Sequence, residues 1–292
     1  MVFSFFIWYN LLGDNMFYIL YNTQSDNKNL LKKIDKLYKN LLKTDDCYKL
    51  DLKEIEKKEI VFLESLDKDD IVYLCGGDGT LNHFINNVGK KQFMCKIYFY
   101  SCGSGNDFKR DYDNKKYIDI TNIITKMPKC YINGNEKYYF ENGIGIGIDA
   151  VVCRKKNQLN FTSVKKNYFK IAIDSFKNFR PYSLDLILDD EKMHFDNVWL
   201  VVCNNGKYLG GGMKMCPKAI RDDLEFDTII IHDVSRIKIA LFFPLIYLGL
   251  HIKIKGVEYI KCHNFKAIPD GCNIFQMDGE TLDYAREVIV KS

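Results

Sequence analysis

The sequence predicts an α/β nucleotide-binding domain with a parallel sheet, followed by a second, mainly antiparallel β domain. Strands and amphipathic helices alternate over the first 128 residues, and two of those strands are followed by glycine-rich loops. Long apolar runs punctuated by glycines fill the remainder. A chain of 292 residues exceeds the usual size of one hydrophobic core. We therefore expect two domains, 1–128 and 129–292.

Composition and charge exclude several classes of protein. Hydrophobic residues make up 47% and charged residues 27% of the chain, which is typical of a folded globular protein. A net charge of +4 does not indicate a nucleic-acid binder. The 10 cysteines lack a CxxC pair, which favours reduced thiols over disulfides or zinc. Residues 1–15 are apolar, but they are too short to span a membrane and lack the features of a signal peptide, so they are an extension of open role.

The first half alternates between strands and helices. Apolar and β-branched runs predict strands at 17–22, 47–51, 71–75 and 96–100. Helical spacing of apolar residues predicts helices at 28–44 and 81–88, with a charged helical segment ending near 66. This alternation is what predicts a parallel sheet.

The second half is richer in long apolar runs. These predict antiparallel strands within 138–152, 184–190, 197–205 and 226–234. A helix capped by Asn160 is expected over 160–179, and an apolar segment follows at 237–255.

The first glycine-rich loop, 76–80, has the sequence GGDGT and lies between a strand and a helix. Amides at a helix N-terminus attract anions, and glycines let a phosphate approach the backbone. An aspartate in such a loop repels phosphate unless it helps to hold Mg²⁺, so Asp78 is the informative residue. A tight turn with a solvated aspartate is the alternative.

The second loop, 103–108, has the sequence GSGNDF and also follows a strand. The carboxyl ends of parallel strands meet at one edge of the sheet, where ligands bind in this architecture. Two such loops therefore predict one phosphate-binding site at that edge.

Five motifs in this order resemble the diacylglycerol kinase catalytic family, which includes soluble bacterial diacylglycerol kinases and, more distantly, sphingosine kinases. The motifs are GGDGTLN at 76–82, GSGNDF at 103–108, NGIGIGIDA at 142–150, the glycine-rich and acidic segment at 205–227, and DGE at 278–280. The resemblance implies an ATP-dependent lipid kinase that transfers the γ-phosphoryl group of Mg·ATP to a lipid hydroxyl, with diacylglycerol as the default acceptor and phosphatidic acid as the product. ATP and Mg²⁺ are the implied cofactors.

The resemblance also implies which residues bind the nucleotide. They are Asn22, Gly76, Gly77, Asp78, Gly79, Thr80, Leu81, Asn82, His83, Ser104, Gly105, Asn106 and Asp107. His83 stands where the family usually has glutamate, and Cys102 replaces a proline.

Acidic side chains gather at 222–227, where they offer oxygen ligands to a hard cation, although acidic turns are commonly only solvated. The resemblance implies a structural Mg²⁺ held at Ile220, Asp223 and Glu225, partly through main-chain carbonyls. Leu224 replaces a glycine of the family in this loop.

The late DGE motif brings two carboxylates to a flexible turn. A lipid hydroxyl needs a general base to attack the γ-phosphoryl group, and the resemblance assigns that base to this motif. Both Glu280 and Asp278 are candidates, and Asp78 is expected to position the metal. Because Asp-Gly is also a strong hairpin signal, a plain β-turn is the alternative.

Apolar residues at 236–255 are flanked by the basic residues Arg236, Lys238, Lys253 and Lys255, which fits docking on an anionic membrane surface. A buried helix broken at Pro244 is the alternative. We therefore expect a cytoplasmic enzyme at the inner face of the membrane, with a lipid substrate, no transmembrane segment and no nucleic-acid partner. A homodimer is left open.

Two other functions are weighed against this one. An NAD or other small-molecule kinase would share GGDG, but the second loop and the late DGE argue against it. A catalytically impaired nucleotide-binding regulatory protein is suggested by His83 and Leu224, which depart from the family pattern. ATP binding without phosphoryl transfer would support the regulatory protein over a kinase.

Overall fold

The structure of the protein is a computed structural model. The structure describes residues 16–23, 30–113, 115–134, 136–158, 171, 174–221, 223–272 and 274–292. The chain forms two compact units that meet in the sequence between Met127 and Pro128. The predicted extension 1–15 and most of the predicted helix 160–179 lie outside the described residues.

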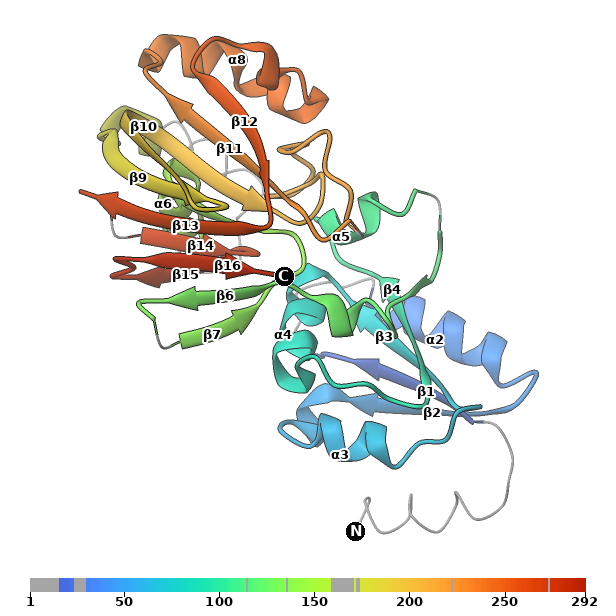
Figure 1. Ribbon diagram of the computed structural model, residues 1–292. Coiled ribbons are helices and arrows are strands. Elements are labelled where there is room, and N and C mark those ends of the chain that lie inside the picture. Colours follow the sequence, from blue (N-terminus) through green and yellow to red (C-terminus); the bar gives the residue numbers. More distant parts are fainter. Residues whose placement is uncertain are drawn as a thin grey trace. The chain divides into compact units, whose positions relative to one another are not determined.

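The first unit contains the expected α/β layer, with a sheet of five described strands in the order β2-β1-β3-β4-β5 (Figure 1). The strands β1 to β4 pair in parallel, and β5 adds one antiparallel edge. The strands are β1 (Met16–Tyr21), β2 (Asp46–Asp51), β3 (Ile71–Gly76), β4 (Lys96–Ser101) and β5 (Ile118–Asp119). The helices are α2 (Leu30–Leu41), α3 (Glu59–Glu64), α4 (Asp78–Val88) and α5 (Asp107–Arg110), with 3₁₀ turns η1 (Leu52–Ile55) and η2 (Ile124–Lys126).

The helices of this unit form where apolar residues recur with helical spacing. In α2 the buried residues are Leu30, Ile34 and Leu37, which lie on one face, while lysines occupy the other. In α4, Leu81 and Phe84 are fully buried. The prediction of a mostly parallel α/β layer is therefore confirmed for this unit.

The second unit is the expected antiparallel β domain, with eleven described strands (Figure 1). Their order is β15-β14-β8-β10-β9-β13-β16-β6-β7, and β11 joins β10 to β12. The strands are β6 (Lys129–Ile132), β7 (Glu136–Tyr139), β8 (Gly143–Gly147), β9 (Tyr182–Leu188), β10 (Glu191–Asn204), β11 (Phe226–His232), β12 (Val257–Cys262), β13 (Asn264–Asp270), β14 (Ile274–Met277), β15 (Glu280–Asp283) and β16 (Val288–Lys291). The helices are α6 (Ile148–Gln158) and α8 (Arg236–Leu248), with a 3₁₀ turn η4 (His251–Lys253).

One predicted strand region was wrong. The run 138–152 was expected to be strands, but β8 ends at Gly147 and helix α6 begins at Ile148. Gly147 has φ +119°, a left-handed conformation that ends the strand, and a Cβ there would lie 2.4 Å from the carbonyl oxygen of Trp199. Ile148 and Val151 of α6 pack against the main core of this unit, so tertiary burial overrides their strand propensity.

Within the described parts of the chain, no helix has both the length and the apolar content to cross a bilayer.

Candidate active site

Three loops of the first unit lie at one edge of the sheet. Because β1, β3 and β4 are parallel neighbours, their carboxyl ends carry Asn22, the loop from Gly76 to Thr80 and the loop from Gly103 to Asp107 at the same edge. The strand order reverses direction at β1, and such a switch point is where open α/β sheets bind ligands. The predicted common edge for the two glycine-rich loops is therefore present.

The first loop forms the N-terminus of α4. Gly77 is the N-cap residue, and the amides of Thr80 and Leu81 bond to its carbonyl. The preceding amides of the first turn have no partner within a helix, and amides in this position can bind an anion. Gly79 is exposed, and a Cβ built on it would meet nothing within 4 Å. The outer face of this turn is therefore open to a ligand.

Asp78 joins the two glycine-rich loops. Its Oδ2 accepts the amide of Asp107 and its Oδ1 accepts the amide of Phe108, each at 3.2 Å. The carboxylate therefore caps α5 from the neighbouring loop. Asp107 and Phe108 lie 29 and 30 positions after Asp78 in the sequence. These contacts give Asp78 a positioning role that the sequence pattern did not show.

The backbones of the two loops touch at their glycines. A Cβ on Gly103 would lie 2.6 Å from the Cα of Gly77, a distance that real Cβ atoms essentially never show. The amide of Cys102 donates to the carbonyl of Gly76 at 2.6 Å. Only glycine allows this approach at 103, so the glycines hold the two loops together as well as leaving room for a ligand.

Asn106 closes the second loop. It has φ +57°, and its Nδ2 donates to the carbonyl of Gly103 at 2.9 Å. Its Oδ1 accepts the hydroxyl of Ser101. The side chain of Asn106 therefore holds the loop from inside, whereas the predicted ligand residue Ser104 is exposed.

Other predicted nucleotide residues differ in exposure. Leu81 is fully buried and Thr80 nearly so, which places both side chains in the packing of α4. Asn82 accepts from Asn86 at 3.0 Å through its carbonyl. His83 is exposed, and its Nε2 lies 3.1 Å from the Nδ2 of Asn87.

The DGE motif is a two-residue hairpin turn between β14 and β15, in which Met277 and Glu280 pair. Asp278 and Gly279 both have positive φ, +49° and +91°, as a type I′ turn requires. The DGE motif therefore has the geometry of a β-hairpin turn. Its two carboxylates differ in their surroundings.

Asp278 points back into its own domain. Its Oδ2 accepts the amide of Glu141 at 2.7 Å, and its Oδ1 accepts the amides of Asn142 and Gly143 at 3.0 Å. Glu280, by contrast, is exposed. The structure therefore separates the two acidic residues into an anchor and a solvent-facing carboxylate.

A buried network supports the turn. Gln276 donates to the Oδ2 of Asp149 at 3.0 Å and accepts the amide of Gly279 at 3.1 Å. Burial raises the pKa of the Asp149 carboxyl to about 6, and the hydrogen bond from Gln276 opposes that rise. A Cβ on Gly145 would lie 1.7 Å from the Oδ2 of Asp149, so the NGIGIGIDA motif leaves space for this contact. Sequence reasoning missed Gln276 and Asp149, because only strand pairing brings them together.

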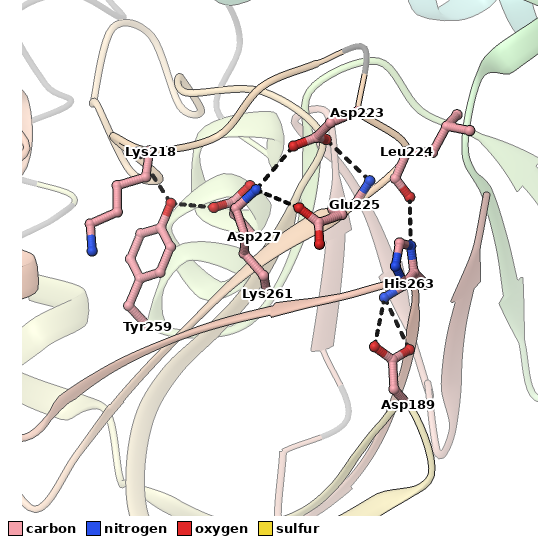
Figure 2. Close-up of polar contacts among 9 residues, drawn as sticks. All are labelled: Asp189, Lys218, Asp223, Leu224, Glu225, Asp227, Tyr259, Lys261 and His263. Carbon is pink, nitrogen blue, oxygen red and sulfur yellow. Dashed lines mark hydrogen bonds and ion pairs between the residues drawn. The ribbon is translucent and has the colours of Figure 1, made fainter.

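The predicted metal residues Asp223 and Glu225 lie together (Figure 2). The Nζ of Lys261 is 3.0 Å from Asp223 Oδ2 and 2.6 Å from Glu225 Oε2, and these carboxylates raise the pKa of the lysine, Glu225 foremost. Ile220 has an exposed side chain, and its carbonyl accepts the amide of Asp223 at 3.2 Å.

A lysine ammonium therefore stands between the carboxylates that the resemblance assigns to Mg²⁺, so the residues as arranged do not fit a divalent cation there. Among the described residues, which exclude Asp222, no group of three His, Cys, Asp or Glu side chains is placed to hold a metal.

Paired glycine-rich loops at a helix N-terminus are typical of the class of phosphate-binding sites. Comparison with known proteins agrees with this class. Residues 16–130 match the diacylglycerol kinase catalytic domain, and residues 142–287 match the YegS C-terminal NAD kinase beta sandwich-like domain. The chain belongs to the diacylglycerol kinase family of lipid kinases.

Individual relatives are distant but cover most of the chain. A Bacillus subtilis protein named "Putative lipid kinase YtlR" is 28% identical over 226 residues, which is 71% of this chain and 72% of that protein. A Mycobacterium tuberculosis protein named diacylglycerol kinase is 25% identical over 221 residues, 72% of this chain and 70% of that one. A crystal structure described as a diacylglycerol kinase from Bacillus anthracis has a TM-score of 0.62 at 14% identity, covering 96% of this chain and 94% of that one. The last likeness shows the fold alone.

Proposed function

We propose that this protein is a kinase that transfers the γ-phosphoryl group of Mg·ATP to the hydroxyl of a lipid, with diacylglycerol as acceptor and phosphatidic acid as product. The observation that carries the proposal is the open first turn of α4 at Gly79, which lies beside a second loop that Asp78 holds in place. Family membership supplies the reaction class.

In this proposal the first unit binds the nucleotide. The backbone amides at the start of α4 receive the phosphates, and the glycines let them approach. Each oxygen of a carboxylate has more than one lone pair. Asp78 can therefore position the second loop and still interact with the Mg²⁺ that accompanies ATP. That Mg²⁺ would neutralise phosphate charge during transfer.

The second unit supplies the base. Glu280 is the carboxylate of the DGE turn that is exposed, whereas the oxygens of Asp278 are occupied by backbone amides. As the lipid hydroxyl oxygen forms its bond to the γ-phosphorus, Glu280 takes the hydroxyl proton. The bond from the γ-phosphorus to the bridging oxygen breaks, and ADP leaves. Gln276 and Asp149 position the turn.

A panel of acceptors tests the proposal. The second domain matches a family described as NAD kinase-like, so NAD is the competing acceptor. Incubating the chain with labelled ATP, Mg²⁺ and either diacylglycerol, sphingosine or NAD should label diacylglycerol. Label in NAD alone would replace the lipid assignment with a small-molecule kinase. ATP binding without transfer to any acceptor would favour a regulatory protein.

We further propose that α8 docks on an anionic membrane surface. The helix buries Ile239, Phe242 and Ile246 against its own domain. It exposes Ile237 and Leu241 on the opposite face, where they are 75% and 74% exposed. Apolar side chains left in water on one face of a helix are typical of an interaction surface.

Exposed lysines lie on α8 and in the segment that follows it in the sequence. Lys238, Lys253 and Lys255 are exposed, and such cations attract anionic lipid headgroups. Arg236, also expected to contribute, has another role: its guanidinium donates to the carbonyls of Phe176, Lys177 and Phe179. The proposed location is therefore the cytoplasmic face of the membrane, with three lysines in the contact.

A single substitution tests the docking face. Leu241→Gln should lower the rate on diacylglycerol in anionic vesicles about tenfold, because it removes an exposed apolar side chain that would enter the bilayer. Its rate on a dispersed short-chain diacylglycerol should stay at the wild-type value. Leu31→Gln is the matched control, since Leu31 is an exposed leucine on α2. Equal rates for both variants on vesicles would contradict the docking role of α8.

A further inference from the structure

The acidic loop before β11 is shaped by its own backbone. Leu224 has φ +62°, a strained conformation for a leucine, and it turns Asp223 and Glu225 toward the same side (Figure 2). The amide of Glu225 donates to Asp223 Oδ1 at 3.1 Å. Two carboxylates that lie this close repel each other unless a cation lies between them.

The neighbouring strand supplies that cation. In the antiparallel pair of β11 and β12, Lys261 lies directly opposite Asp227. Directly opposed residues in a sheet project to the same face, so this register places the Lys261 side chain beside Asp227. Its ammonium reaches both Asp223 and Glu225.

Two carbonyls of the loop, those of Ile220 and Leu224, have partners as well. The Ile220 carbonyl accepts the amide of Asp223, and the Leu224 carbonyl lies 3.3 Å from Nδ1 of His263. Because a carbonyl can only accept, His263 donates from that nitrogen. His263 is itself held by its amide, which donates to the carboxylate of Asp189 at 3.0 Å.

We infer that Lys261 is the resident cation of this loop and takes the place of the structural divalent metal that the resemblance implies. The ammonium is covalently part of the chain, so its contacts with Asp223 and Glu225 do not depend on the Mg²⁺ concentration. Removing the ammonium should leave the carboxylates free to bind a divalent ion. This inference concerns folding and is independent of the proposed kinase reaction.

The experiment compares Lys261→Met with the wild type in thermal unfolding, in EDTA and in Mg²⁺, without nucleotide. The wild-type Tm should be the same in both. Lys261→Met should have a Tm about 3–6 °C lower in EDTA, because two carboxylates lose their shared counter-ion, and Mg²⁺ should restore part of the loss. A second change, Lys261→Met with Glu225→Gln, should abolish the response to Mg²⁺.

Lys266→Met is the matched control. Lys266 lies on β13 and, among the described residues, pairs with one carboxylate, Glu287, at 2.5 Å, with side-chain exposure similar to that of Lys261. This variant should be close to wild type in EDTA and in Mg²⁺. Lys261→Arg keeps the charge and should remain indifferent to Mg²⁺, which provides a readout if the methionine variant does not fold.

Three results would overturn the inference. The first is a wild-type Tm that rises with Mg²⁺ and loses that rise in Glu225→Gln, because a metal would then bind beside the lysine. The second is a Lys261→Met chain as stable as Lys266→Met. The third is a destabilised Lys261→Met chain that Mg²⁺ does not stabilise. In that case the carboxylates of Asp223 and Glu225 could not bind a divalent ion even without the lysine.

Discussion

Glu280→Gln is expected to lower kcat for lipid phosphorylation by about 10²–10⁴, with little change in the KM for ATP. The amide has nearly the same shape as the carboxylate but cannot accept a proton. Glu280 is exposed at the end of a hairpin turn, so the change should leave the Tm unaltered. The measurement is steady-state kinetics on short-chain diacylglycerol, alongside thermal unfolding.

The control for this prediction is Asp283→Asn. Asp283 is an exposed carboxylate on the same strand and pairs with Arg154 at 3.2 Å. Exposed ion pairs of this kind contribute about 0–1 kcal/mol, so this variant should keep both its stability and its kcat. If Glu280→Gln turned over as fast as Asp283→Asn, the DGE turn would be only a hairpin and Asp78 would be the next candidate base.

Asp278→Asn gives the contrast. An asparagine has one acceptor oxygen, and its NH₂ group would face a backbone amide that now donates to Asp278. Hydrogen bonds to a charged group are worth about 1.5–3 kcal/mol each, so the free energy of unfolding should fall by about that amount. A loss of stability here together with an intact fold in Glu280→Gln would separate the anchor from the base.

Much of the fold could be predicted because its patterns are local. The spacing of Leu30, Ile34 and Leu37 predicts α2, and the apolar runs before the two glycine-rich loops predict β3 and β4. Helix α6 could not be predicted in the same way. Its first residues, Ile148 to Val152, are rich in β-branched side chains, and their helical conformation depends on packing against strands distant in the sequence.

The sequence predicts where the loops of the candidate site lie, but not which residues contact one another there. The motifs identify the loops at the strand ends, yet the bond from Asp278 to the amide of Glu141 spans 137 residues. The contact from Lys261 to Asp223 spans 38 residues and depends on the register of β11 with β12. Contacts of this kind follow from strand pairing, which a single sequence does not specify.

Substitutions at two glycines should separate ligand binding from folding in the first unit. Gly79→Ala should weaken ATP binding about 10- to 100-fold, because the new methyl group would stand in the open face where the phosphates approach. The fold should tolerate the change, since a Cβ there meets nothing within 4 Å. Because alanine is a better helix former than glycine, the free energy of unfolding should stay the same or rise by about 0.4–1 kcal/mol. Calorimetric titration with ATP and thermal unfolding measure the two effects.

Gly103→Ala is the opposite case. Its methyl group would be forced against the Cα of Gly77, where backbone meets backbone and no side chain can move aside. We expect a loss of about 1–3 kcal/mol in stability, accompanied by weaker ATP binding because the two loops are pushed apart. If Gly79→Ala bound ATP as tightly as the wild type, the phosphates would have to bind at another place. That conclusion would hold even if Gly103→Ala were destabilised as expected. A phosphate site on α4 requires that Gly79→Ala keep its stability and lose ATP binding. It also requires that Gly103→Ala lose both.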